Sequence, residues 1–238
     1  MMNQPDAIRQ DLKKYADAEK AAFLPKFFQA FPGGYGEGDQ FIGVAVPNQR
    51  KVARKYCKSV SLNDLDMLIR DPVHECRLTA IFILVLKYEK ARSEAEREKI
   101  VSIYLNNLSS INNWDLVDSS AYKILGPYLF EKERSLLYRM AGSGKLWQER
   151  IAVITTMHFI RNNDYNDTLK LAEMMLDHEH DLIHKAVGWM LREIGNRDFD
   201  IEYEFIKRHY QEMPRTMLRY AIEKFNPGLR KNILAGKF

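Results

Sequence analysis

The stretch NWDLVDSS, residues 113–120, decides the fold, because related eight-residue stretches occur at four other places in the chain. All five can be aligned on a charged third position. Successive third positions are separated by 38, 35, 35 and 30 residues, a period that accommodates two helices and two turns. Such a period is typical of HEAT-type repeats. The aligned stretches are ECRLTAIF (75–82), NWDLVDSS (113–120), QERIAVIT (148–155), IHKAVGWM (183–190) and MPRTMLRY (213–220).

The rest of the chain also has a helical pattern. Apolar residues recur at spacings of three and four, and alternating strand-like runs are almost absent. A single helix pair cannot cover its own apolar face, so we expect the pairs to stack into an all-α, right-handed array with a concave face. No linker divides the chain, which predicts one domain over residues 1–238, and a monomer is the default for this architecture.

Local signals refine this prediction at the N-terminal end. Asp6 is placed to cap a first helix, which Pro25 interrupts and FFQAF (27–31) resumes. The glycine-rich residues 31–46 form one long irregular connection. Pro47 then suits the first turn of the next helix.

The composition is that of an ordinary globular protein, with 46% apolar and 29% charged residues. The longest apolar run, AIFILVLKY (80–88), is too short to span a bilayer, and the N-terminal residues lack a signal pattern, so we expect a cytoplasmic protein without membrane segments. Cys57 and Cys76 are predicted to be reduced and buried. A net charge of +4 permits an anionic partner.

The third position of the repeat is basic in four of the five stretches, which place Arg77, Arg150, Lys185 and Arg215 there. If the inner helices present these side chains to one surface, they form a cationic stripe suited to the backbone of a polyanion. Alternatively, the same residues tie neighbouring helices together. The sequence leaves both interpretations open.

Two other positions of the repeat hold residues that depart from its pattern. The sixth position is small or apolar except for Asp118, and the seventh holds Trp189. Trp114 lies four residues before Asp118, on the same helix face. Two indole rings and a carboxylate would form a site for a cation. Core packing of the tryptophans and a buried, hydrogen-bonded Asp118 are the structural alternatives.

These stretches resemble a known family. NNWDLVDSSAYKILG (112–126), LWQERIAVI (146–154) and HKAVGWMLRE (184–193) look like the AlkD family of DNA alkylation repair glycosylases, and FIGVAVPNQRKVARKY (41–56) is similar to its N-terminal signature. The resemblance implies a HEAT-like array whose concave face holds duplex DNA. It also implies excision of cationic N3- and N7-alkylpurines, such as 3-methyladenine and 7-methylguanine, without base flipping.

The resemblance also assigns roles to individual residues. Asp118 matches the catalytic carboxylate, Trp114 and Trp189 match tryptophans that flank the deoxyribose of the lesion, and Arg150 matches an arginine near the DNA backbone. An alkylated purine is already positively charged, so no general acid is required, and a carboxylate stabilises the sugar cation. Neither a metal nor an organic cofactor is expected. Ala45 departs from the family pattern, where a basic residue precedes the Val-Pro pair, and this change is expected to weaken DNA contact.

Two other functions compete with this interpretation. HDLIH (180–184) imitates the HExxH zinc motif, but Asp181 is one methylene too short for the usual base and no third ligand is evident. The second alternative is a non-catalytic repeat module that binds an unusual DNA structure or a protein partner. Asp118 discriminates between this binding module and a glycosylase, because a scaffold has no need of an acid between two tryptophans.

Overall fold

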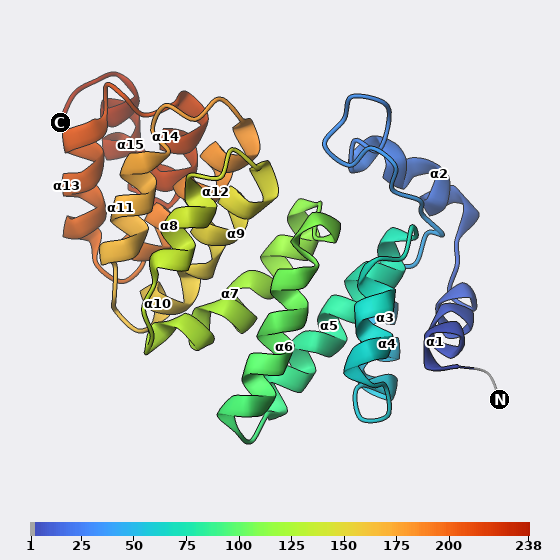
Figure 1. The fold of residues 1–238 in the computed structure, drawn as a ribbon. Helices are drawn as coiled ribbons and strands as arrows, with labels where there is room; N and C mark the ends of the chain where they lie inside the picture. Colours follow the sequence, from blue (N-terminus) through green and yellow to red (C-terminus); the bar gives the residue numbers. More distant parts are fainter. Residues whose placement is uncertain (1–2) are drawn as a thin grey trace. The chain divides into compact units, whose positions relative to one another are not determined.

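The computed structural model describes residues 3–238, and every regular element in that range is a helix (Figure 1). Strand-like pairing in this range is limited to one parallel bridge between Gln40 and Val73. The all-α prediction is therefore confirmed. None of the described helices has the length and apolar character needed to cross a membrane. The helices are α1 (Gln4–Lys13), α2 (Ala18–Phe27), α3 (Val46–Tyr56), α4 (Leu62–Ile69), α5 (His74–Lys90), α6 (Glu94–Asn106), η1 (Leu108–Ser110), α7 (Trp114–Phe130), α8 (Ser135–Ala141), α9 (Leu146–Thr155), α10 (Met157–Arg161), α11 (Asn166–Met174), α12 (Asp181–Gly195), α13 (Phe199–His209), α14 (Arg215–Ala221), η2 (Ile222–Lys224) and α15 (Pro227–Leu234).

The predicted repeat of helix pairs is confirmed. The five aligned stretches fall on α5, α7, α9, α12 and α14, and each is followed by a second helix before the next stretch begins. The third pair contains the short α10 in addition to α9 and α11. The period found in the sequence therefore corresponds to one helix pair.

Residue contacts divide the chain into two compact units, residues 1–124 and 125–238. In the first unit, α1, α3 and α4 pack against α5, which is buried along most of its length. In the second, α12 contacts α9, α13 and α14. Gly188 permits the approach of α14, because a Cβ atom there would lie 2.5 Å from the Met217 carbonyl oxygen. The single domain over residues 1–238 stays a prediction.

The N-terminal helices differ in detail from the sequence prediction. Asn3, and not Asp6, caps α1, since its side chain accepts the N–H of Asp6. The chain breaks after α1, where Asp17 caps α2, and Pro25 lies inside α2 and does not end it. The boundary between α1 and α2 therefore lies at the Asp17 cap and not at Pro25. Pro47 lies in the first turn of α3, as predicted, and the irregular connection ends at residue 45, one residue before the predicted end.

Candidate active site

A cavity of about 390 Å³ lies in the first unit and is lined mainly by aromatic and aliphatic side chains. Phe27 and Phe28 come from the end of α2, Phe41 from the irregular connection and Trp114 from the start of α7. Asp118, one turn further along α7, also lines the cavity. The predicted pair of Trp114 and Asp118 therefore faces one shared space.

The indole of Trp114 is held by ring contacts and by the start of its helix. Its ring centroid lies 5.4 Å from that of Phe28 in a stacked arrangement and 5.9 Å from that of Phe27 in an edge-on arrangement. The Asn113 side chain accepts the N–H of Trp114 at 2.9 Å. Such contacts orient a large aromatic side chain while the residue as a whole remains only half-buried.

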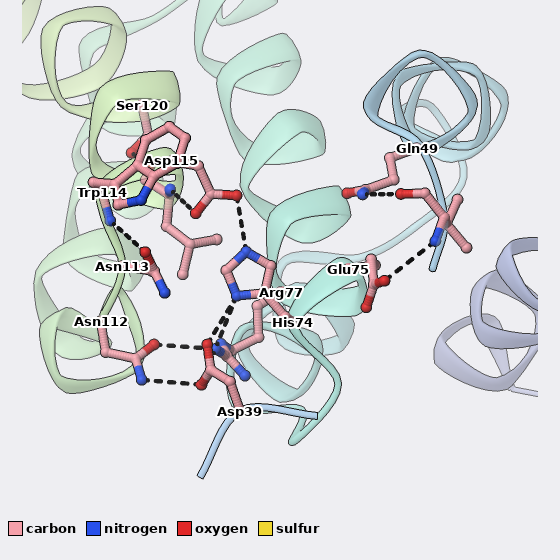
Figure 2. Close-up of polar contacts among 12 residues, drawn as sticks. Asp39, Gln49, His74, Glu75, Arg77, Asn112, Asn113, Trp114, Asp115 and Ser120 are labelled. Atoms are coloured by element: carbon pink, nitrogen blue, oxygen red, sulfur yellow. Dashed lines mark hydrogen bonds and ion pairs between the residues drawn. The ribbon is translucent and has the colours of Figure 1, made fainter. Parts of the chain in front are cut away.

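A buried histidine connects three segments next to the cavity (Figure 2). His74, at the start of α5, is 2% exposed, and its Nδ1 and Nε2 atoms lie 2.9 Å from Asp39 and 2.8 Å from Asp115. Burial opposes protonation of His74, but the charge and hydrogen bond of Asp115, together with the hydrogen bond to Asp39, raise its pKa to about 9. At neutral pH the ring is therefore an imidazolium, which joins the irregular connection to α5 and α7.

The imidazolium is also in contact with the aromatic cluster. Its ring is stacked on Phe28 with centroids 4.8 Å apart and on Phe41 with centroids 5.1 Å apart. A cation near an aromatic face is attracted by the ring quadrupole. His74 thus supports both the carboxylates and the aromatic wall of the site.

Glu75 fixes the edge of the cavity. Its buried carboxylate accepts the backbone N–H groups of Gly43 at 2.7 Å, Ile42 at 3.1 Å and Val44 at 3.2 Å. Gly43 has a φ of +80°, and a Cβ atom there would lie 2.0 Å from the Asp17 carbonyl oxygen. Only glycine therefore permits this loop to approach α2 so closely.

The raised pKa of His74 predicts a pH-dependent stability. Its folded pKa of about 9 exceeds the unfolded value of 6.5, so its contribution is fully present below pH 6.5 and is lost as the pH rises through 9. We expect the free energy of unfolding to fall by about 3 kcal/mol more in the wild type than in His74→Gln over this interval. Denaturant titrations between pH 6 and 9.5 measure the difference. His158→Gln is the control, and equal pH profiles for wild type and His74→Gln would contradict the assignment.

The third-position residues do not all lie at an exposed surface. Arg77 is 4% exposed, and its guanidinium lies 2.6 Å from Asp39 and also donates to Asn112 and to the Asp71 carbonyl oxygen. These partners hold Arg77 inside the first unit, and its contact with DNA stays a prediction. The alternative interpretation, a tie between neighbouring segments, describes it.

The remaining predicted residues lie in the second unit. Arg150 is buried and donates to the Leu182 carbonyl oxygen, Lys185 is half-buried and pairs with Asp181 at 2.6 Å, and Arg215 is exposed. Trp189 is half-buried, and its indole N–H donates to Glu193 at 3.2 Å. Proximity of Trp189 to Trp114, and contact of these residues with DNA, stay predictions.

The sequence interpretation missed a basic surface next to the cavity. Phe82, which lines the cavity, also lines a second hollow of about 80 Å³ together with Arg50 and Arg54 from α3 and Lys123 from α7. The Arg50 guanidinium lies 4.0 Å from the centroid of the Phe82 ring. The spacing of four between Arg50 and Arg54 was the available signal, since it places both on one helix face.

The HDLIH stretch does not assemble a metal site. His180 caps α12, with its ring nitrogen accepting the N–H of Leu182, while His178 contacts Glu149 at 3.1 Å. Across residues 3–238, no group of three or more His, Cys, Asp or Glu side chains is arranged to hold a metal ion. The histidines of this turn instead organise the start of α12.

Known proteins similar to this chain are consistent with the repeat. A family model described as DNA alkylation repair enzyme matches residues 8–225. A solved structure described as a predicted DNA alkylation repair enzyme from Enterococcus faecalis is similar over 89% of this chain and 97% of that chain, with a TM-score of 0.68 and 17% sequence identity. At this identity the likeness shows the fold alone. No curated protein matches the sequence.

Proposed function

Because the chain belongs to the family of DNA alkylation repair enzymes, we propose that it is a monofunctional DNA glycosylase acting on cationic N3- and N7-alkylpurines in duplex DNA. A role in DNA repair, with DNA as the partner, follows from the family. The observation that supports the proposed glycosylase activity is the cavity that Trp114 and Asp118 of α7 both line.

The proposed reaction needs stabilisation only where charge moves. As the bond between the sugar and the purine nitrogen breaks, its electron pair neutralises the charged base and leaves an oxocarbenium on the sugar. Asp118 stabilises this cation and orients the attacking water, whose proton passes to solvent. Trp114 and Trp189 hold the nucleotide through their ring faces. In this proposal the lesion stays in the helix until the bond breaks, and neither a metal nor a lysine Schiff base takes part.

Release of methylated purines from alkylated duplex DNA tests the proposal. The wild type is expected to release 7-methylguanine or 3-methyladenine and to leave an abasic strand uncut. An undamaged duplex of the same sequence is the control. A folded protein that binds DNA but releases no base would refute the glycosylase and favour a module that binds DNA without chemistry. The cytoplasmic location and the monomeric state stay predictions.

The basic surface next to the cavity predicts the salt dependence of DNA binding. Each phosphate contact contributes about 0.9 to the slope of log K against log salt concentration. We therefore expect the double variant Arg50→Ala/Arg54→Ala to lower the magnitude of the slope by about 2. Fluorescence anisotropy of a labelled duplex at several salt concentrations measures it. Arg97→Ala, on the acidic α6, is the control, and an unchanged slope in the double variant would exclude these two arginines from the interface.

A further inference from the structure

The cavity contains a buried hydrogen-bond acceptor without a partner. Gln49 on α3 is 3% exposed and lines the cavity, and its Oε1 atom has no hydrogen-bond partner among residues 3–238. Its Nε2 atom donates to the Val44 carbonyl oxygen at 2.7 Å. This bond sets the orientation of the amide, because the opposite orientation would place two oxygens together. Since an unsatisfied buried acceptor costs stability, Gln49 is suited to a ligand that supplies an N–H donor.

The walls around this acceptor restrict the shape of the ligand. Phe28 and Phe41 are parallel, with centroids 5.4 Å apart, and Trp114 is stacked on the same Phe28 ring. In Figure 2 the Oε1 atom of Gln49 points toward the side on which Asp115 lies. Aromatic walls favour a flat, conjugated ring, and bases are commonly held by stacking on such side chains. The ligand class is therefore a planar heterocycle with an N–H donor at its edge.

We propose that this cavity binds the purine base released by the reaction, with Gln49 Oε1 accepting a hydrogen bond from its exocyclic amine. The inference rests on the proposed glycosylase function. Cleavage converts the cationic purine into a neutral base, which suits an apolar cavity better than the charged lesion does. The free base is no longer tethered to the strand, so it can leave the stack without rotation of the backbone. The cavity thus separates the product from the sugar.

Aromatic side chains also continue from this cavity onto the exposed surface of α2. Phe27 lines the cavity and is 49% exposed, and Phe23, one turn earlier on α2, is 58% exposed with its ring centroid 5.9 Å from that of Phe27. Exposed aromatic side chains that continue into a lined cavity provide a stacking surface for a base. They also explain two large apolar side chains at a surface where packing does not require them.

Filling the cavity tests where the base binds. Titration calorimetry of the protein with free 3-methyladenine, without DNA, gives the dissociation constant. Ala45 is half-buried and lines the cavity, so Ala45→Phe is expected to weaken binding at least tenfold. Gln40→Phe, an exposed position outside the lining, should bind as the wild type does. If Ala45→Phe fails to fold, Leu24→Trp from α2 fills the same space. Unchanged binding in a folded, cavity-filling variant would overturn the proposal.

Altering the donor tests the role of Gln49. Dimethylation of the exocyclic amine, as in N6,N6-dimethyladenine, removes the N–H group, and we expect the wild type to prefer adenine to this analogue by about tenfold. Gln49→Met should bind both bases equally. If a folded Gln49→Met variant still prefers adenine to the dimethylated analogue, a group other than Gln49 accepts the hydrogen bond from the amine.

The binding assay and the excision assay separate this inference from the proposed function. Excision by the wild type without binding of the free base would overturn the product cavity and leave the glycosylase intact. Binding of the base without excision would support the cavity and refute the glycosylase. Excision by the wild type, together with loss of free-base binding in Ala45→Phe, is the result expected if both hold.

Discussion

Replacement of Asp118 by asparagine is expected to reduce the single-turnover rate of base release on the order of 10²–10³-fold. Asparagine keeps the shape of the side chain at the cavity edge but removes the negative charge that opposes the sugar cation. Binding of the alkylated duplex should change little, because the phosphates and not Asp118 contribute most of the affinity. Quantitation of released 7-methylguanine, with a parallel anisotropy titration, measures both quantities.

Glu131→Gln provides a matched control for the loss of a carboxylate. Glu131 is exposed just beyond the end of α7, and its replacement should leave the rate of release unchanged. Equal rates in wild type and Asp118→Asn would remove Asp118 from the mechanism and return it to the structural alternative. A parallel loss of DNA affinity and rate in Asp118→Asn would point instead to a damaged fold, which thermal melting would reveal.

Replacement of Arg77 by alanine is expected to destabilise the first unit by about 3–5 kcal/mol, because it removes one of the two charged partners of a buried carboxylate and leaves that carboxylate with His74 alone. The Asp39 side chain is 3% exposed, and although burial opposes ionisation, the hydrogen bond from His74 and the charge of Arg77 lower its pKa. Arg77 also donates to Asn112, just before α7. Denaturant titration at neutral pH measures the change in unfolding free energy.

The double variant Arg77→Ala/Asp39→Ala identifies the source of that loss. If the cost comes from the Asp39 carboxylate that has lost Arg77, the double variant should be less destabilised than the sum of the two single variants. Lys20→Ala is the comparison for a surface pair, since Lys20 is 55% exposed and bonded to Asp17, and it should cost about 1 kcal/mol or less. An equally small cost for Arg77→Ala would show that the buried pair is not important for stability.

The sequence predicted well those features that depend on local spacing. The five aligned stretches fall on helices because apolar residues spaced three and four apart form one apolar face of a helix, whatever that face packs against. Trp114 and Asp118 share a cavity for the same reason, since residues four apart lie on one side of a helix. Pro47 likewise begins α3 because its fixed φ suits the first turn.

Features that depend on distant partners were predicted poorly or not at all. Arg77 has the same position in the repeat as Arg215, yet Arg77 is buried beside Asp39 and Arg215 is exposed. Nothing in the repeat distinguishes them, because the partner of Arg77 lies 38 residues away in an irregular segment. Pro25 was misjudged because the competing cap at Asp17 determined where α2 begins.

The sequence by itself determined the all-helical repeat, its period and the family, since these follow from short-range periodicity and local motifs. Only the tertiary structure decided which charges are buried, which remain accessible and what surrounds Trp114 and Asp118. The bonds of His74 to Asp39 and Asp115 join residues 35 and 41 positions apart. Only the folded structure likewise shows that the Oε1 atom of Gln49 is buried without a partner beside the aromatic side chains of the cavity. Burial and electrostatics depend on everything that folds around a group, and helical spacing reports only its neighbours on one helix.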